Sequence, residues 1–266
     1  DEADEADWIA ERVRESLAAQ PERSPRDLVV LYRTNAQSRA LEEVCIQQGI
    51  PYRLVGGVGF YKRREVRDLL AYLRVVNNGS DKVSFSRIVN LPRRGIGKQS
   101  LVDFQRWAAE IGGSYDDALT RLIAGEQSPL SSRAARLFAE FGQSLLRWRE
   151  IATGGDLLHL LDTIISEIGY NLYLHEISDD EAQAIERGEN VQELRGLLLK
   201  AQDARQGLSE FLAEQSLVAD VDALADDADA VTLLTLHAAK GLEFPIVFII
   251  GCEEGLMPHM RAFDEP

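Results

Sequence analysis

The sequence predicts an α/β protein, mostly helical overall, in which a partial parallel sheet is interrupted by a large all-helical insertion. Short apolar runs typical of buried strands occur only near the two ends of the chain. Between them, roughly 170 residues show helical periodicity, with Gly, Pro, Ser and Asn turns as connections. The 266 residues are enough for one or two domains, and 45% hydrophobic residues are enough to bury a core.

The first part of the chain alternates between helix and strand. Residues 8–19 form an amphipathic pattern that the Pro-containing segment 20–25 ends, and residues 27–32 are a strand-like run. A second helix is expected over 38–48, closed by Gly49, and a second strand over 52–55. This alternation indicates part of a parallel α/β sheet.

The middle of the chain is expected to be a helical domain. Helical periodicity covers residues 64–76, 84–91, 99–111, 115–124, 131–151, 157–168, 181–204 and 208–216. Residues 231–236 and 245–250 then resemble buried parallel strands separated by a short turn or helix. The simplest organisation is one α/β domain made of residues 1–57 and 230–266, with a helical domain inserted at 58–229.

The overall charge is acidic, but its distribution is uneven. The chain carries 44 Asp and Glu against 29 Lys and Arg, a formal net charge of -15, which by itself excludes a generally basic nucleic-acid binder. Segments 1–7, 179–193 and 220–229 each carry -5, and the last two are expected on surface connections. Residues 33–98 carry +8. That stretch is either a nucleic-acid footprint or a set of solvated helix faces with pairs such as Arg64 and Asp68.

Nothing in the sequence indicates export, a membrane span or a metal site. The longest apolar stretch, 244–252, is far too short to cross a bilayer, and the acidic start differs from a signal peptide. Cys45 and Cys252 lack metal-ligand spacing, and we expect reduced thiols in a cytoplasmic protein. Asp1, Glu2 and Asp4 follow no strand, so we interpret them as an acidic first helical turn.

The loop after the strand at 27–32 is a candidate ligand site. Open parallel sheets bind ligands at the carboxyl ends of their strands. Arg33, Thr34, Asn35 and Arg39 lie there and could donate hydrogen bonds to phosphate oxygens. The residues alone equally allow a simple helix cap by Asn35 or Ser38.

The segment from Pro92 to Lys98 is a candidate nucleic-acid-binding hairpin. Gly95 and Gly97 flank Ile96 between two predicted helices, so the backbone can turn tightly and approach a partner. Arg93, Arg94 and Lys98 surround the turn with positive charge. The pattern is similar to helix-hairpin-helix elements, which grip the nucleic-acid backbone without reading bases. The alternative is a plain turn between two helices.

The segment 231–258 carries the densest set of candidate residues. Its first strand delivers Thr235 and His237 to the carboxyl edge of the sheet, and Lys240, Gly241 and Glu243 follow before the next strand. Thr, His and Lys suit phosphate or sugar contacts, and a carboxylate suits a ribose hydroxyl. A single histidine is more often structural than functional, so the residues alone do not assign a functional role to His237.

Four blocks together resemble a known family. TLHAAKGLEF with VFIIGCEEGLMPH is similar to motif V and its extension in superfamily 1 DNA helicases of the UvrD/PcrA/Rep type. YRTNAQSRALEE resembles their motif IVa, GVGFYKRREVRDLLAYLR the next block, and NLPRRGIGKQSL the duplex-contacting hairpin. The blocks occur in the family's order and cover nearly the whole chain.

The resemblance implies a second RecA-like domain interrupted by a helical domain, and ATP-driven 3'-to-5' translocation on single-stranded DNA. It also implies ATP with Mg²⁺ between two RecA-like domains, the remaining helicase domains and DNA as partners, and a role in DNA repair or replication, with repair proteins as further candidate partners. Gly241 and Glu243 would bind ATP. The single strand would contact Arg33, Thr34, Asn35, Arg39, Thr235, His237 and Lys240, and duplex DNA would contact Arg93, Arg94, Gly95, Ile96, Gly97 and Lys98.

The sequence also departs from the family's complete pattern. It contains no G-x-x-x-x-G-K-[ST] phosphate loop and no arginine-bearing final motif. We therefore expect a fragment with no catalytic residues of its own, no bound cofactor and no ATPase activity. Two alternatives are a regulatory or partner-binding helical module, and part of a helicase-nuclease of the RecB or AddA kind.

Overall fold

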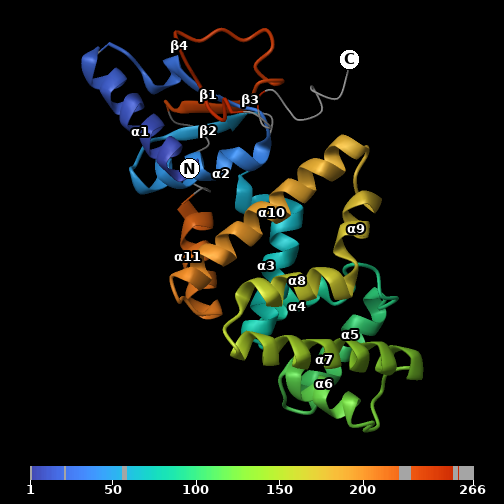
Figure 1. Cartoon of the computed structure of the whole chain (residues 1–266). Helices are drawn as coiled ribbons and strands as arrows, with labels where there is room; N and C mark the ends of the chain where they lie inside the picture. Colours follow the sequence, from blue (N-terminus) through green and yellow to red (C-terminus); the bar gives the residue numbers. More distant parts are fainter. Residues whose placement is uncertain (1, 21, 56–58, 222–228, 254–256, 258–266) are drawn as a thin grey trace. The chain divides into compact units, whose positions relative to one another are not determined.

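A computed structural model describes residues 2–20, 22–55, 59–221, 229–253 and 257 (Figure 1). The chain forms two compact units, one made of residues 1–63 and 215–266 and the other of residues 64–214. The division falls at 63/64 and 214/215, whereas the sequence pattern indicates 57/58 and 229/230. Each unit has its own core and is described by itself.

The first unit contains a sheet of four parallel strands. Their order is β2 (Tyr52–Val55), β3 (Val231–Thr235), β1 (Leu28–Tyr32) and β4 (Ile246–Ile249). Every residue of the central strand β1 is buried, as its continuous apolar run predicts. The parallel sheet in a mostly helical chain confirms the predicted α/β class.

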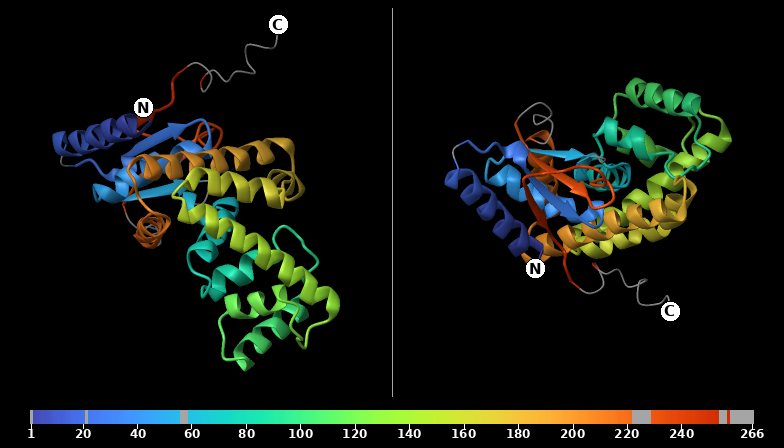
Figure 2. Two further views of the ribbon diagram at one scale, coloured as in Figure 1. Left: turned by 60° about the horizontal axis from the view of Figure 1, so that its bottom comes forward. Right: turned by 90° about the horizontal axis from the view of Figure 1, so that it is seen from above.

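Two helices cover one face of this sheet, as can be followed in Figures 1 and 2. Helix α1 (Glu2–Ala19) contributes Ile9 and Val13, and α2 (Ser38–Gln47) contributes Leu41 and Val44, to a core with the inward side chains of β1 and β3. Helix α2 is followed by Gly49 at a φ of +66°, a left-handed conformation that favours glycine. The two helices therefore form one core with the central strands β1 and β3.

The second unit is helical. Its helices are α3 (Arg64–Asn77), α4 (Lys82–Ile88), α5 (Lys98–Glu110), α6 (Tyr115–Ile123), α7 (Ser132–Thr153), α8 (Leu157–Ile168), α9 (Tyr170–Glu176) and α10 (Glu181–Asp203). Helix α11 (Leu208–Val221) crosses the second boundary between the units. The periodicity predicts each of them except α9, which follows α8 after the single left-handed residue Gly169.

An aromatic cluster holds α4, α5 and α7 together. Phe104 of α5 stacks on Phe138 of α7 with ring centroids 4.3 Å apart, and on Phe85 of α4 at 5.6 Å. Trp148, also on α7, packs edge-on against Tyr72 of α3. Because α4 and α5 flank the segment from Pro92 to Lys98, this packing fixes both ends of the predicted hairpin.

One of the acidic segments differs from the surface connection that we expected. Most of segment 179–193 belongs to α10, so its charges lie on a helix. Of segment 220–229, residues 222–228 lie outside the described residues, but Asp229 accepts hydrogen bonds from the Ser24 hydroxyl and the Arg26 backbone. No described helix has the length and apolarity needed to cross a membrane.

Candidate nucleic-acid interface

Two loops of the first unit leave the sheet side by side. Strands β1 and β3 are parallel neighbours, and the last pair in register is Tyr32 with Thr235. The Leu236 amide donates to the Tyr32 carbonyl oxygen at 2.8 Å, which extends the pairing one residue further. The segments after β1 and after β3, defined here as the β1 loop (33–37) and the β3 loop (236–243), therefore start from the same carboxyl edge.

The β1 loop is organised by Gln37, a residue that sequence reasoning missed. Its side-chain oxygen accepts from the backbone amides of Arg33 at 2.9 Å and Thr34 at 3.0 Å. The Ser38 hydroxyl donates to the Asn35 carbonyl oxygen at 2.9 Å. These bonds fix the backbone, so the side chains of Arg33, Thr34 and Asn35 start from set positions, each partly exposed.

Gly251, just after β4, lies against the same glutamine. It adopts a φ of +67°, and a Cβ there would collide with the Gln37 amide nitrogen. Its backbone amide donates to the Glu5 carboxylate at 3.1 Å. The end of β4 thus supports the β1 loop, and one acidic residue of α1 has a specific bonding role. The sequence signal for this close contact is Gly251, the first residue of the block GCEEGLMP.

The β3 loop presents its polar side chains to solvent. The Thr235 hydroxyl accepts from the Ala238 amide at 3.3 Å, and the Thr235 carbonyl accepts from Ala239 at 3.0 Å, which closes a turn. His237, Lys240 and Glu243 are exposed, and their side chains have no hydrogen-bond or ion-pair partner within the described part of the chain. Gly241 has a φ of +85°, so the loop needs glycine there.

Arg39 does not belong to this exposed surface, and its contact with a single strand stays a prediction. Its side chain is 4% exposed, and its guanidinium group is ion-paired with Glu43, which also accepts from the Tyr61 hydroxyl at 2.9 Å. The four-residue spacing of Arg39 and Glu43 on a helix is the sequence signal for this pair. Arg39 therefore stabilises the packing of α2.

A second buried arginine joins α2 to the residues just before α3. Arg63 is 6% exposed, donates to the Ser38 hydroxyl oxygen at 2.7 Å and lies 3.7 Å from the Glu42 carboxylate. Glu42 also accepts from the Phe60 amide at 3.1 Å. Because Ser38 bonds the β1 loop as well, one polar cluster fixes both the loop and the segment from Phe60 to Arg63.

In the second unit, Asn90 shapes the hairpin between α4 and α5. Its side-chain oxygen accepts from the backbone amides of Arg94 at 2.8 Å and Ile96 at 3.1 Å. Gly95 has a φ of +86°, which explains the glycine. Ile96 is only 3% exposed and points into the core, whereas Gly95, Gly97 and Lys98 are exposed. Ile96 thus anchors the hairpin, and its contact with duplex DNA stays a prediction.

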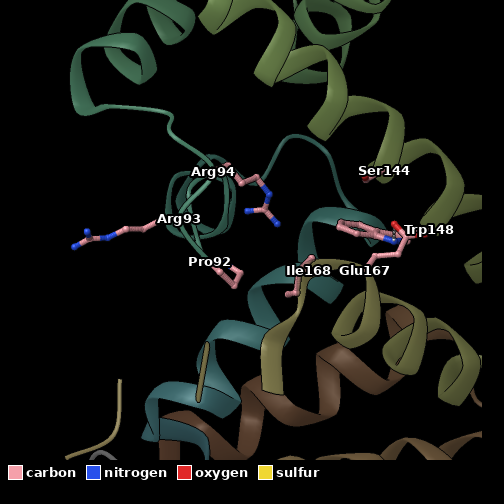
Figure 3. A pocket seen from close by; sticks show the side chains of 7 residues that line it. All are labelled: Pro92, Arg93, Arg94, Ser144, Trp148, Glu167 and Ile168. Carbon is pink, nitrogen blue, oxygen red and sulfur yellow. Dashed lines mark hydrogen bonds between the residues drawn. The ribbon is translucent and has the colours of Figure 1, made fainter. Parts of the chain in front are cut away.

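The neighbouring arginines of the hairpin differ in direction. The Arg94 guanidinium donates to the carbonyl oxygens of Ile88 and Leu91, both at 2.9 Å, and to the Tyr72 hydroxyl at 2.6 Å. It also lies over the Phe141 ring at 5.0 Å. Figure 3 shows Arg94 turned inward and Arg93 pointing away from the other labelled side chains. Arg94 therefore holds the hairpin together, and its contact with duplex DNA stays a prediction.

The positive stretch 33–98 is consequently not one continuous surface. Arg39, Arg63 and Arg87 are committed to carboxylates, Arg87 to the fully buried Asp68 at 2.5 Å. Arg93 and Lys98 are exposed and make no hydrogen bond or ion pair with any described residue. Across the described ranges, no group of three or more His, Cys, Asp or Glu side chains could hold a metal ion.

Comparison with known proteins gives consistent matches over the chain. The family described as the UvrD-like helicase C-terminal domain matches residues 1–265. The ATP-dependent DNA helicase UvrD1 of Mycobacterium tuberculosis is 41% identical over 284 residues, which cover 100% of this chain and 36% of the relative. The ATP-dependent DNA helicase PcrA of Staphylococcus aureus is 39% identical over 266 residues, 98% of this chain and 35% of the relative. The chain thus spans about a third of the length of these curated relatives.

Proposed function

The chain belongs to the family of UvrD-like helicase C-terminal domains, and we propose that it supplies DNA contacts and half of the ATP cleft of an ATP-dependent 3'–5' DNA helicase acting in repair or replication. In this proposal the first unit is the second RecA-like domain and the second unit is the inserted helical domain. The partners are DNA and the remaining domains of such a helicase. The named activity of UvrD1 and PcrA is consistent with it.

The observation that carries the proposal is the register of Tyr32 with Thr235. It brings the β1 loop and the β3 loop, about two hundred residues apart in sequence, to one edge of the sheet. Arg33, Thr34 and Asn35 on one loop and His237 and Lys240 on the other then form a polar strip, with Leu242 as the exposed apolar residue of the β3 loop. Such a strip suits the phosphates and sugars of a single strand, which carry no sequence information.

The roles within the strip follow from exposure and chemistry. Lys240 and Arg33 supply positive charge for phosphate oxygens, and Asn35 and His237 supply hydrogen bonds. The Thr235 hydroxyl is already an acceptor for the Ala238 amide, so its remaining proton is available to a ligand oxygen. Contacts of this kind favour binding without preference for base sequence.

Glu243 and Gly241 are the proposed nucleotide-binding residues. The exposed Glu243 carboxylate has two acceptor oxygens without described partners, which fits a pair of ribose hydroxyl groups. Gly241, at a φ of +85°, leaves the adjacent backbone uncovered. ATP with Mg²⁺ would supply the free energy for translocation. The carboxylates described provide no cluster for Mg²⁺, so its ligands would come from elsewhere in the helicase.

In the helical unit, the hairpin is the proposed duplex contact. Arg93 and Lys98 would bind phosphates, and the exposed backbone of Gly95 and Gly97 would allow close approach. Arg94 and Ile96 act behind this surface by fixing the hairpin's shape. Binding is expected to be weak, because the net charge of -15 repels phosphate outside these surfaces.

Fluorescence anisotropy with a labelled single-stranded oligonucleotide tests the single-strand contacts. We expect Asn35→Ala and His237→Ala each to weaken binding about threefold to tenfold at low salt, in line with the loss of one good hydrogen bond. His175→Ala, a matched exposed histidine on α9, should leave the affinity unchanged. Unchanged affinity in both loop variants, with the fold intact, would overturn the proposal.

A further inference from the structure

The first turn of α7 lies against the hairpin of the second unit. A Cβ atom placed on Gly95 would lie 3.4 Å from Nη2 of Arg133 and 3.7 Å from Cδ1 of Leu137. Arg133 and Leu137 are four residues apart, so they share one face of α7. The guanidinium group of Arg133 is therefore beside the glycine turn, although 38 residues separate it from Gly95 in the sequence.

The start of α7 is held firmly in this place. Ser131 caps the helix by accepting from the Ala134 amide at 3.2 Å, and Ala134 is buried. Phe138 stacks on Phe104 of α5, the helix that begins at the end of the hairpin. Because caps and stacked rings fix both helices, the backbone of Arg133 has a set position beside the turn, from which its side chain can reach a ligand there.

Like the exposed Arg67, Arg93 and Arg205 of this unit, Arg133 has no carboxylate partner among the described residues, whereas two other arginines of α7 do. Arg136, on the next turn of α7, is 3.7 Å from Glu140, and Arg147 is 2.9 Å from Glu167. Arg133 is exposed and makes no hydrogen bond or ion pair with any residue that the structure describes. Its charge is thus available to a ligand, like the charges of Arg93 and Lys98.

We propose that Arg133 is a further phosphate-binding residue of the hairpin surface, which consists of Arg93, Gly95, Gly97, Lys98 and Arg133. The proposal rests on the proposed function of the hairpin as a duplex contact. Three unpartnered cations from α7 and the hairpin then surround a turn whose backbone is open to close approach. A guanidinium group can bind two phosphate oxygens at once, which a lysine cannot.

The ligand chemistry favours a duplex backbone over bases. The hairpin surface presents only cationic side chains and glycine backbone, which suit phosphate oxygens, and its five residues include no aromatic ring that could stack on an unpaired base. Binding should therefore depend on salt and hardly on sequence. An acidic protein segment would satisfy the same cations, and competition between the two ligands is part of the test.

The test compares variants of the chain by anisotropy of a labelled blunt duplex, at salt concentrations from about 50 to 200 mM. We expect Arg133→Ala to weaken binding about threefold to tenfold at the lowest salt and to lower the salt slope by about one. Arg133→Lys should restore the slope and part of the affinity. Arg121→Ala, which removes an exposed charge on α6, is the control and should change neither quantity.

Lys98→Ala separates this inference from the proposed function. If Lys98→Ala weakens binding while Arg133→Ala behaves like Arg121→Ala, the inference about Arg133 is wrong and the hairpin function stands. If neither variant weakens binding, the duplex function itself is wrong. Tighter binding of an acidic peptide than of duplex in the unmodified chain, with loss of that binding in Arg133→Ala, would also overturn the assignment to DNA. Thermal unfolding should be unchanged in Arg133→Ala, because its side chain bonds no residue that the structure describes.

Discussion

At the scale of single residues, exposure and bonding separate functional charges from structural ones. Arg93 and Arg94 are adjacent, but only Arg94 donates to backbone carbonyls and to the Tyr72 hydroxyl. Burial raises the pKa of Tyr72 to about 12, although the Arg94 charge and hydrogen bond lower it. Tyr72 therefore stays neutral at physiological pH, so its hydroxyl can donate to the Leu91 carbonyl oxygen while it accepts from Arg94.

The two arginines are expected to give opposite results when replaced by alanine. Arg94→Ala removes donors from two carbonyls and a hydroxyl, so it should lower the free energy of unfolding by about 2 kcal/mol. Arg93→Ala should leave stability unchanged, because its side chain bonds nothing described, and should weaken duplex binding. Thermal denaturation and duplex anisotropy measure the two effects. Equal stability of both variants would contradict the structural role of Arg94.

The two cysteines should also differ in reactivity. Cys45 is buried on α2, and burial together with the Glu42 charge raises its pKa to about 12, so its thiol stays protonated and shielded at pH 8. Cys252 is exposed. With a thiol-reactive disulfide reagent at pH 8, we expect one fast equivalent in the native chain and two after denaturation. In Cys252→Ser the fast phase should vanish. Two fast equivalents in the folded chain would be inconsistent with the packing of α2.

At the scale of elements, the β1 loop depends on neighbours that approach from distant parts of the sequence. Gln37 binds the loop's amides, Gly251 after β4 leaves room for Gln37, and Glu5 of α1 binds Gly251. The conformation of the β1 loop therefore depends on Gln37, on the end of β4 and on α1. A change at the end of β4 should reach the proposed single-strand contacts without touching any of their side chains.

Gly251→Ala tests this dependence, and Gly49→Ala is its matched control. Both glycines have a positive φ, so alanine should cost each variant about 1 kcal/mol of stability. A Cβ at position 49 meets no atom within 4 Å, whereas one at 251 collides with Gln37. Only Gly251→Ala should weaken single-strand binding in addition. Equal binding by the two variants would mean that Gln37 does not set the loop.

The sequence predicts the elements better than it predicts the contacts between them. Strand and helix periodicity places nearly every element within a few residues of its observed bounds, because burial of one face determines that period. The sequence pattern does not predict helix α9, because this helix is only seven residues long and follows α8 directly. The sequence also does not predict the structural role of Arg94, because its acceptor Tyr72 lies 22 residues away on α3. The proximity of Arg133 to Gly95 likewise cannot be predicted from the sequence, because it depends on how α7 packs against the hairpin.

At the scale of the whole molecule, the charge total conceals local surfaces of opposite sign. The acidic residues include some with specific bonding roles, such as Glu5 and Asp229, and the basic stretch 33–98 includes arginines neutralised by buried carboxylates. The proposed DNA contacts are then limited to the strip at the sheet edge in one unit and the hairpin surface in the other. Affinity should therefore be weak, salt-dependent and lost through few substitutions.

The most direct test is site-specific photocrosslinking of the strip at the sheet edge. A benzophenone amino acid at position 34 on the β1 loop, or at position 238 on the β3 loop, is irradiated with a labelled single strand, and a probe at the exposed Trp8 on α1 is the control. We predict crosslinks from both loop positions, competed by unlabelled single strand, and none from position 8. Crosslinks no more frequent from the loops than from position 8 would contradict the central claim that the two loops form one DNA-binding edge.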